Sequence, residues 1–431
     1  MNRSIVTILL VLFPVCTAIA QTPSFAAQRF PTPEFESGYS LPDAEPNPQP
    51  HGPAAEVADI AFLVIALCLV SYFSIRGRSR KAIFLIMLAS LLYLGFWRQG
   101  CVCPIGATQN IALGLTDSSH VVSVSAIIFF FAPLIIALFF GRAFCGGVCP
   151  LGALQDLFVI RPLKIPAWAE QGLSMLPVIF LGTAVVLATT GTGFLICAAD
   201  PLVPILRLSG TTAALAAGGI LLIIGMVIAR PYCRFVCPYA VLLKWTSALS
   251  RHRVTVTPDE CIQCGLCENV CPFDAIRKPG DTTGGESKGR GLSRVAVLLV
   301  LLPLGMLGGA WIGGRVAPTF AAHDRNVRLL HLLESEQTDP DNLQVRAFRQ
   351  TQQTIESVRA KAREAHTMFS RRFRLLGAVI GLIFILKLLM LSLKRNQTDY
   401  EPDPSLCVNC GRCFAFCPVH QKEARASESS G

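Results

Sequence analysis

Charged residues are scarce in this chain. Only 15% of its 431 residues are Asp, Glu, Lys or Arg, whereas 52% are hydrophobic; an ordinary soluble domain carries about 25% charged residues. This deficit argues against a soluble enzyme and against disorder. The net charge of +10 would suit a nucleic-acid binder on arithmetic alone, but the basic residues border long apolar blocks. We therefore expect a membrane protein, with no nucleic-acid partner.

The chain also lacks the signatures of several redox cofactors and of a disulfide framework. No C-x-x-C-H sequence is present, so a c-type haem is not expected. Gly106-Ala107-Thr108 resembles part of a covalent-flavin motif without its flanking residues, and we reject that interpretation. Most of the 17 cysteines are grouped in tight C-x-x-C and C-x-x-x-C-P clusters. That grouping indicates metal or cluster ligation.

The first 20 residues have the features of a secretory signal. Arg3 precedes an apolar core at 5–16, and Ala18-Ile19-Ala20 has the form of a cleavage site. An uncleaved anchor is the alternative, and both place residue 21 outside the cytoplasm. Residues 21–57 are rich in proline without periodicity, which predicts an extended extracytoplasmic linker.

Seven apolar blocks follow, and a membrane span needs roughly 17–25 residues. The blocks lie near 58–75, 82–97, 121–141, 174–196, 212–229, 295–313 and 375–393. Basic residues are concentrated in every second connection, which predicts that the connections at 142–173 and 230–294 and the tail after 393 are cytoplasmic. The fold class is therefore mainly α: a polytopic helical protein of the cell membrane, with about seven spans after a signal peptide.

The predicted domains follow from this layout. A membrane domain at 58–250 precedes a ferredoxin half at 251–294, a membrane hairpin at 295–393 and a second ferredoxin half at 394–431. The extracytoplasmic loop of the hairpin, 315–374, carries more basic residues than its side predicts. Apolar residues recur in it at helical spacing. That stripe predicts a helix packed on the chain itself or on the membrane surface; a docking helix for an outside protein is the alternative.

Two C-x-x-C-x-x-C-x-x-x-C-P runs carry the strongest chemical signal. This run is the bacterial ferredoxin pattern for a [4Fe–4S] cluster, whereas structural zinc is usually bound by two separate ligand pairs. In two-cluster ferredoxins the fourth cysteine of each run binds the other cluster. We therefore predict one cluster on Cys261, Cys264, Cys267 and Cys417, and one on Cys407, Cys410, Cys413 and Cys271. The ferredoxin-like α+β domain would then be split by the hairpin.

Three further cysteine pairs share the pattern R-x-x-C followed by C-P directly after an apolar block. The repeat predicts helices that end in a cysteine loop, with proline opening the next helix. On the inner face, four thiolates suffice for one more iron–sulfur centre: Cys145, Cys149, Cys233 and Cys237. Reduced thiols are the alternative. On the outer face, Cys101, Cys103 and Cys197 with the nearby Asp200 would bind a cluster or metal, or form a disulfide.

The combination resembles the NosR/NapH-type membrane polyferredoxins. Cys145-Gly-Gly-Val-Cys149-Pro150 and Cys233-Arg-Phe-Val-Cys237-Pro238 carry the match, with Cys261 to Cys271 after them. The resemblance implies electron transfer between the quinone pool or cytoplasm and extracytoplasmic reductases or flavoproteins. This chain lacks the extracytoplasmic flavin-binding domain of the longest members, and it splits its two ferredoxin runs.

The sequence thus predicts a membrane-bound iron–sulfur protein that passes single electrons and serves as a subunit of an oxidoreductase system. Two [4Fe–4S] clusters are expected, with one or two further iron–sulfur centres. The expected partners are the membrane, a cytoplasmic donor and an extracytoplasmic acceptor. The rival functions are a redox-sensing regulator, an assembly factor for a metalloenzyme, or a scaffold with structural clusters.

Overall fold

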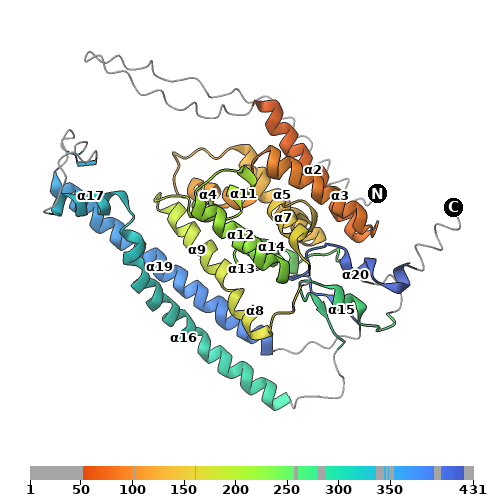
Figure 1. The fold of residues 1–431 in the computed structure, drawn as a ribbon. Helices are drawn as coiled ribbons and strands as arrows, with labels where there is room; N and C mark the ends of the chain where they lie inside the picture. The colour runs from red at the N-terminus through yellow and green to blue at the C-terminus, as the bar shows by residue number, and fades with distance from the viewer. Residues whose placement is uncertain are drawn as a thin grey trace.

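The computed structural model describes most of the chain beyond residue 51. The described residues are 52–100, 103–160, 162–256, 261–279, 288–335, 344–345, 348, 354–392 and 399–421. The predicted signal and most of the predicted linker therefore lie outside them. The structure is almost entirely helical, with one short two-stranded sheet (Figure 1).

We call the helices within residues 52–256 the membrane part. Its first helices are α2 (Pro53–Ile75), α3 (Arg80–Ser90), the π-helix η1 (Leu91–Trp97), α4 (Pro104–Gly114), α5 (Val124–Phe140), α6 (Ala143–Gly147), α7 (Pro150–Phe158), α8 (Ala167–Leu173) and α9 (Leu176–Thr189). It continues with α10 (Leu195–Ala199), α11 (Val203–Arg207), α12 (Thr212–Val227), α13 (Pro231–Phe235) and α14 (Tyr239–Ala248). The short helices α4, α7, α11 and α13 have proline at their first or second position, which suits the first turn because it needs no N–H donor.

The two predicted ferredoxin segments meet in one small unit, here called the ferredoxin lobe (261–279 and 399–421). It contains α15 (Leu266–Val270), β1 (Ile276–Arg277), β2 (Glu401–Pro402) and α20 (Arg412–Ala415). The two strands pair antiparallel with Ile276 opposite Pro402, and the Arg277 guanidinium donates to the Asp403 carboxylate. Sequence positions separated by the whole hairpin thus lie side by side.

The hairpin consists of α16 (Lys288–Ala321), α17 (Arg325–Glu334) and α19 (Ile355–Ser392). Helices α16 and α19 pack so closely that glycine is required between them. A methyl group on Gly309 would lie 2.0 Å from the carbonyl oxygen of Gly377, and one on Gly377 would lie equally close to that of Gly309. Small residues allow such close contact between helices in a membrane.

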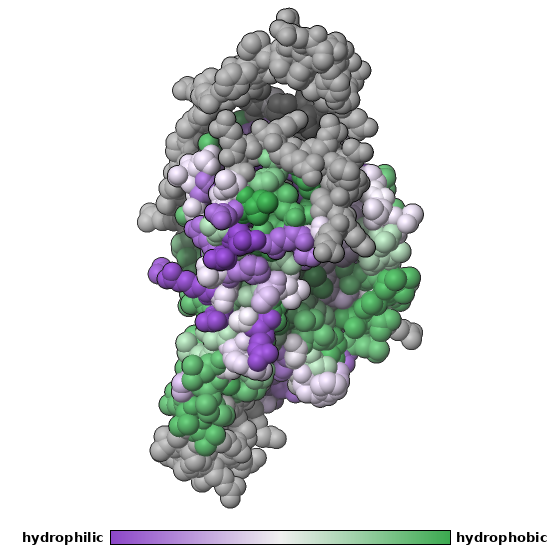
Figure 2. Space-filling view, turned by 90° about the vertical axis from the view of Figure 1, so that its left-hand side faces the viewer, coloured by the Kyte–Doolittle hydropathy of each residue, from purple (hydrophilic) through white to green (hydrophobic). Residues whose placement is uncertain are grey.

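The apolar stripe predicted in the loop of the hairpin packs on the chain itself. Val358, Ala362 and Phe369 on α19 are each at most 2% exposed, and α19 packs against α16 and α17. These contacts favour the first interpretation of the stripe over a docking helix. Figure 2, which views this side of the molecule, shows hydrophilic side chains gathered at mid-height and apolar surface around and below them.

Four helical segments of the described residues are long and apolar enough to cross a membrane. They are Ala54–Ile75, Arg80–Trp97, Trp168–Thr189 and Leu299–Ala321. Two predicted spans are shorter helices, Val124–Phe140 and Thr212–Val227, and the last block forms the end of α19. A protein with membrane-spanning helices is supported, while the count of seven spans stays a prediction. The first span begins at Pro53, within the segment predicted as linker.

A continuous apolar core joins the membrane part to the ferredoxin lobe. It extends from Leu63 on α2, through Cys145 and Cys149, to Phe414 and Cys417 in the lobe. We call the end of the membrane part that carries the lobe the ferredoxin side and the opposite end the distal side (Figure 1). The shared core fixes the lobe to the buried cysteines rather than leaving it on a linker.

Candidate iron–sulfur sites

The first lobe site gathers the cysteines that the sequence predicts for one cluster. A small cavity is lined by all four: Cys261, Cys264, Cys267 and Cys417. Gly265, the N-cap of α15, has a φ of 70°, a left-handed conformation that glycine adopts without strain. It turns the loop between the second and third cysteines. Cys264 is exposed, so this site reaches the surface of the lobe.

The second lobe site lies on the side of the lobe that contacts the membrane part. Charge on Cys271 acts on Cys407 and Cys413, and these two also interact with Cys410. Gly411 repeats the left-handed turn of the first run with a φ of 74°. The structure thus places Cys271 with the run at 407–413 and Cys417 with the run at 261–267, in the exchanged arrangement expected. Ligation itself remains a proposal.

Burial disfavours the anionic form of the thiols in the lobe. Burial raises the pKa of Cys267 to about 11 and that of Cys407 to about 12. Such thiols keep their protons near neutral pH unless a metal displaces them. No three His, Cys, Asp or Glu side chains among the described residues could hold a single metal ion.

The ferredoxin-side buried site comprises the four cysteines predicted for the inner face: Cys145, Cys149, Cys233 and Cys237. Charges on Cys145 and Cys233 act on both Cys149 and Cys237. Cys145, Cys149 and Cys237 are each less than 10% exposed. The structure therefore brings the two C-x-x-x-C-P loops, which are 88 residues apart, together in the interior.

Positive groups surround this buried site. Arg142 Nη2 lies 3.8 Å from Cys145 Sγ, and the Arg230 guanidinium donates to the Cys145 carbonyl. Arg230 is 1% exposed and pairs with the buried carboxylate of Asp156. Gln155 Nε2 lies 3.3 Å from Cys233 Sγ. These donors would offset the negative charge of thiolates and of a cluster.

Cys103, the second cysteine of the first pair, lies much closer to this site than expected. Cys103 and Cys149 line the same small cavity, together with the prolines that open α4 and α7. The sequence placed these two cysteines on opposite faces of the membrane part. The difference arises because each C-P loop returns into the interior before its short helix begins, so the loops meet. Cys101 and the side chain of Cys197 lie outside the described residues.

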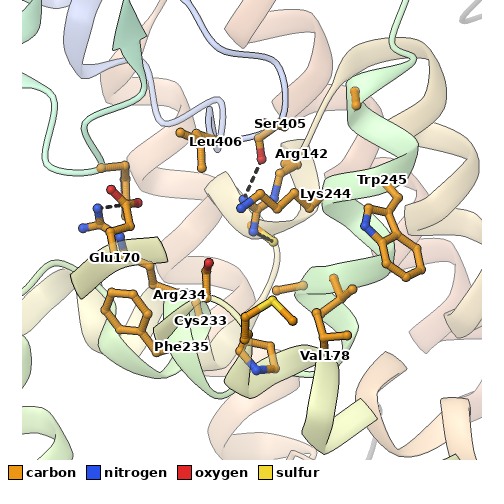
Figure 3. A pocket seen from close by; sticks show the side chains of 18 of the residues that line it. Arg142, Glu170, Val178, Cys233, Arg234, Phe235, Lys244, Trp245, Ser405 and Leu406 are labelled. Carbon is orange, nitrogen blue, oxygen red and sulfur yellow. Dashed lines mark hydrogen bonds and ion pairs between the residues drawn. The ribbon is translucent and has the colours of Figure 1, made fainter. Parts of the chain in front are cut away.

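Two larger cavities flank the buried cysteines. On the ferredoxin side, a cavity of about 570 Å³ is lined by Cys145 and Cys233 and rimmed by residues of the lobe. Figure 3 shows Arg142 reaching Ser405 and Arg234 reaching Glu170 at its edge. On the distal side, a cavity of about 470 Å³ is lined by Cys103 and Asp200. The buried cysteines thus have access from both ends.

The lobe contacts the membrane part beside the buried site through both backbone and side chains. A methyl group on Gly146 would lie 2.1 Å from the Val408 carbonyl oxygen, so only glycine allows this approach. Asn409 Nδ2 donates to the Phe140 carbonyl at 2.7 Å, and Arg412 pairs with Asp156. Gly146 follows Cys145, and Val408 follows Cys407. The second lobe site and the ferredoxin-side buried site are therefore neighbours.

Comparison with known protein families identifies the same segments. One model of a 4Fe–4S binding domain matches residues 122–166 and 210–257, which carry the two C-x-x-x-C-P loops. A second model of a 4Fe–4S binding domain matches residues 254–277 and 400–421, the ferredoxin lobe. The chain therefore carries iron–sulfur binding domains.

The curated relatives are distant. A protein of Escherichia coli (strain K12) named "Putative electron transport protein YccM" is 26% identical over 231 residues, which cover 45% of this chain and 65% of that protein. The uncharacterised protein MJ0750 of Methanocaldococcus jannaschii is 25% identical over 42% of this chain and 77% of its own length. No solved structure matches the chain. Together the matches support an iron–sulfur electron-transfer role, without assigning the NosR/NapH family.

The cysteine motifs do not predict the roles of several other residues at these sites. Gln155, Asp156 and Tyr232 are buried and form hydrogen bonds around the ferredoxin-side cysteines. The one sequence signal for Gln155 is its place in the repeat, because Gln109 stands at the same distance from its C-P pair. Tyr232 has no such signal, since an aromatic residue before a cysteine is not distinctive.

Proposed function

We propose that this protein passes single electrons through the membrane, between the ferredoxin lobe on the cytoplasmic side and an acceptor on the distal, extracytoplasmic side. The observation that carries the proposal is the close contact of Gly146 with Val408, which sets a lobe site against a buried site. The positive-inside pattern supports a cytoplasmic lobe. A hydrocarbon core about 30 Å thick requires intermediate centres between its faces.

The residues of the chain would each make a defined contribution. The lobe cysteines would hold two [4Fe–4S] clusters, and Cys145, Cys149, Cys233 and Cys237 would hold a third centre. A [4Fe–4S] cluster accepts and releases one electron at a time. Arg142, Arg230 and Gln155 would stabilise the extra negative charge of the reduced state, and the apolar core would keep water from the buried thiols.

The proposal is tested with the full chain in sealed liposomes. The lobe faces outward, a membrane-impermeant reductant is added outside, and an electron acceptor is trapped inside. We expect acceptor reduction with wild type, and a fall to the protein-free background when Cys149 and Cys237 are both changed to Ser. The double variant should hold less iron while both lobe EPR signals remain.

Two results would overturn the proposal. Wild-type liposomes that never reduce the trapped acceptor, despite fully loaded clusters, would remove transmembrane transfer and favour a sensing or assembly role. Unchanged iron in a folded Cys149→Ser/Cys237→Ser variant would remove the buried centre. Changing Cys68, a cysteine in α2 outside the motifs, to Ser is the matched control and should leave iron content and transfer unchanged.

A further inference from the structure

The cavity on the ferredoxin side lies where three parts of the chain meet. Helices α9 and α14 of the membrane part line it, α19 of the hairpin contributes Ile383 to Lys387, and the lobe contributes Ser405 and Val408. Helix α19 packs along α9. The proposed electron path uses the cysteines in the wall of this cavity and leaves the rest of the cavity unassigned.

Most of the cavity wall is apolar. Its apolar lining includes Val178, Phe235, Val241, Trp245, Ile383 and Leu386. Trp245 on α14 is 49% exposed and Leu386 on α19 is 41% exposed, so the cavity opens beside these two side chains. Tryptophan is enriched where a membrane meets water. The cavity therefore suits a ligand with an apolar part that enters from the bilayer.

The polar part of the wall is positive. Five lining residues are cationic and one is acidic: Arg142, Arg230, Arg234, Lys244 and Lys387, against Glu170. Two of these cations, Arg230 and Arg234, already form ion pairs with carboxylates. The other three have no ion pair within the part of the chain that the structure describes. This surplus of positive charge favours an anionic ligand.

Lys244 on α14 is the clearest case. Among the described residues its ammonium group has no hydrogen bond or ion pair, although the side chain is half-buried. The like charges of Arg142 and Lys387 act on it unfavourably, and the carboxylates of Glu170 and Asp403 act on it favourably. Each of these carboxylates already pairs with an arginine. Figure 3 shows Lys244 and Arg142 extending into the same space.

Lys387 supplies a second ammonium group, from the hairpin. It donates to the Ser174 hydroxyl and to the Gln171 carbonyl, and an ammonium group has three donors, so one is left. Lys387 lies near the end of α19, and Ser174 lies near the start of the candidate span Trp168–Thr189. Both therefore lie at the level where helices leave the apolar layer. Basic pockets between spanning helices bind lipid head groups on the cytoplasmic side, where the leaflet carries anionic lipids.

We propose that this cavity binds an anionic phospholipid, with its phosphate between Lys244 and Lys387 and its acyl chains along Trp245 and Leu386. The lipid would join α14 to α19 and so hold the hairpin on the membrane part. Its negative charge would lie in the same cavity as Cys233 and would make the ferredoxin-side buried centre harder to reduce. Lipid binding goes beyond the proposed function, and only this effect on the centre rests on it.

Native mass spectrometry of the purified, delipidated full chain tests the binding. We expect phosphatidylglycerol to bind more tightly than phosphatidylcholine with identical acyl chains. Lys244→Met removes an ammonium group without breaking a contact and should weaken phosphatidylglycerol binding about fivefold. Lys244→Arg keeps the charge and should keep the binding. Lys81→Met is the matched control, because Lys81 is an exposed lysine next to Arg80, which contacts the lobe; it should leave binding unchanged.

A second measurement separates a bound anion from a purely structural effect. EPR-monitored titration compares the reduction potential of the ferredoxin-side buried centre in phosphatidylglycerol and in phosphatidylcholine. In wild type we expect a more negative potential in phosphatidylglycerol, and in Lys244→Met a smaller difference between the two lipids. This measurement requires the proposed centre, whereas the binding measurement does not. Failure of the proposed function would therefore leave the lipid site testable.

Three results would overturn the lipid site. The first is equal binding of the two lipids by wild type, or an equal loss of phosphatidylglycerol binding in Lys244→Met and Lys81→Met. The second is displacement of phosphatidylglycerol by an equal concentration of glycerol phosphate, which would identify a soluble phosphate ligand. The third is displacement by ubiquinone with the same affinity in wild type and Lys244→Met, which would identify an uncharged apolar ligand.

Discussion

The two ends of the membrane part share a backbone plan but differ in chemistry. The ferredoxin-side site has four thiols beside the lobe, with Arg142 and Arg230 directed at it. The distal cavity is lined by Cys103 and Asp200, and Arg98 there is already paired with Asp59. Similar backbone arrangements at the two ends can thus carry sites that differ in chemistry. The neighbouring charged residues determine how much negative charge each site can hold.

The largest expected difference between the ends is in stability. Arg230→Leu removes a buried guanidinium from both Asp156 and the Cys145 carbonyl, and it leaves Arg412 as the ion-pair partner of Asp156. Breaking a buried pair in this way costs about 3–5 kcal/mol. Arg98→Leu should cost less, because Asp59 keeps the hydrogen bond from Tyr93 and lines a cavity that admits water.

Thermal unfolding in detergent would measure this difference. Arg253→Leu, which removes an exposed guanidinium, is the control and should change little. Equal losses of stability in the Arg230 and Arg98 variants would contradict the asymmetry of the two ends.

Reduction potentials should separate the two ends next. Gln155→Leu removes the donor to Cys233, and loss of a hydrogen bond to cluster sulfur destabilises the reduced, more negative state. We expect the potential of the ferredoxin-side buried centre to become more negative. Gln109→Leu removes the corresponding glutamine at the distal end. It should leave the reduction potential of the ferredoxin-side buried centre unchanged. EPR-monitored redox titration would measure the potential of this centre in each variant. The same shift in potential from both variants would show an effect of packing alone and would contradict the role of the Gln155 hydrogen bond.

The smallest expected effect is on the stability of the lobe, which contacts the ferredoxin side of the membrane part and not the distal side. Burial acts to raise the pKa of Asp403, but hydrogen bonds from Ser405 and Arg277 outweigh it and hold the pKa below the usual range. The stability from this lowered pKa is present above the unfolded value of about 3.9 and is lost as the pH falls through the folded value. Asp403→Asn should therefore destabilise the lobe by about 1 kcal/mol at pH 7.

That loss should shrink as wild type is acidified, which unfolding curves at stepwise lower pH would show. The ferredoxin-side centre should respond to lobe unfolding while the distal end does not. A constant difference between wild type and Asp403→Asn at all pH values would exclude the carboxylate as the cause.

The sequence predicted the lobe better than the membrane part. Tight cysteine spacing within one loop is local information, so the runs at Cys261 and Cys407 and their exchange of fourth cysteines could be predicted directly. The meeting of Cys103 with Cys149 could not, because hydropathy detects spans and does not detect short helices that turn back into the interior. The hydrogen bonds that Gln109 and Gln155 accept from the backbone of Ile196 and Tyr232 could not be predicted either, because they join distant segments and leave no local trace in a single sequence.

The split of the lobe has a consequence for biogenesis. Cys417 lies beside Cys261 and its neighbours, and Cys271 lies with the run that begins at Cys407. During synthesis the ribosome makes the first run, then the whole membrane hairpin, and only then the second run. Neither lobe site can be complete before both hairpin helices have been synthesised. A chain that stalls at the hairpin therefore carries only unfinished sites.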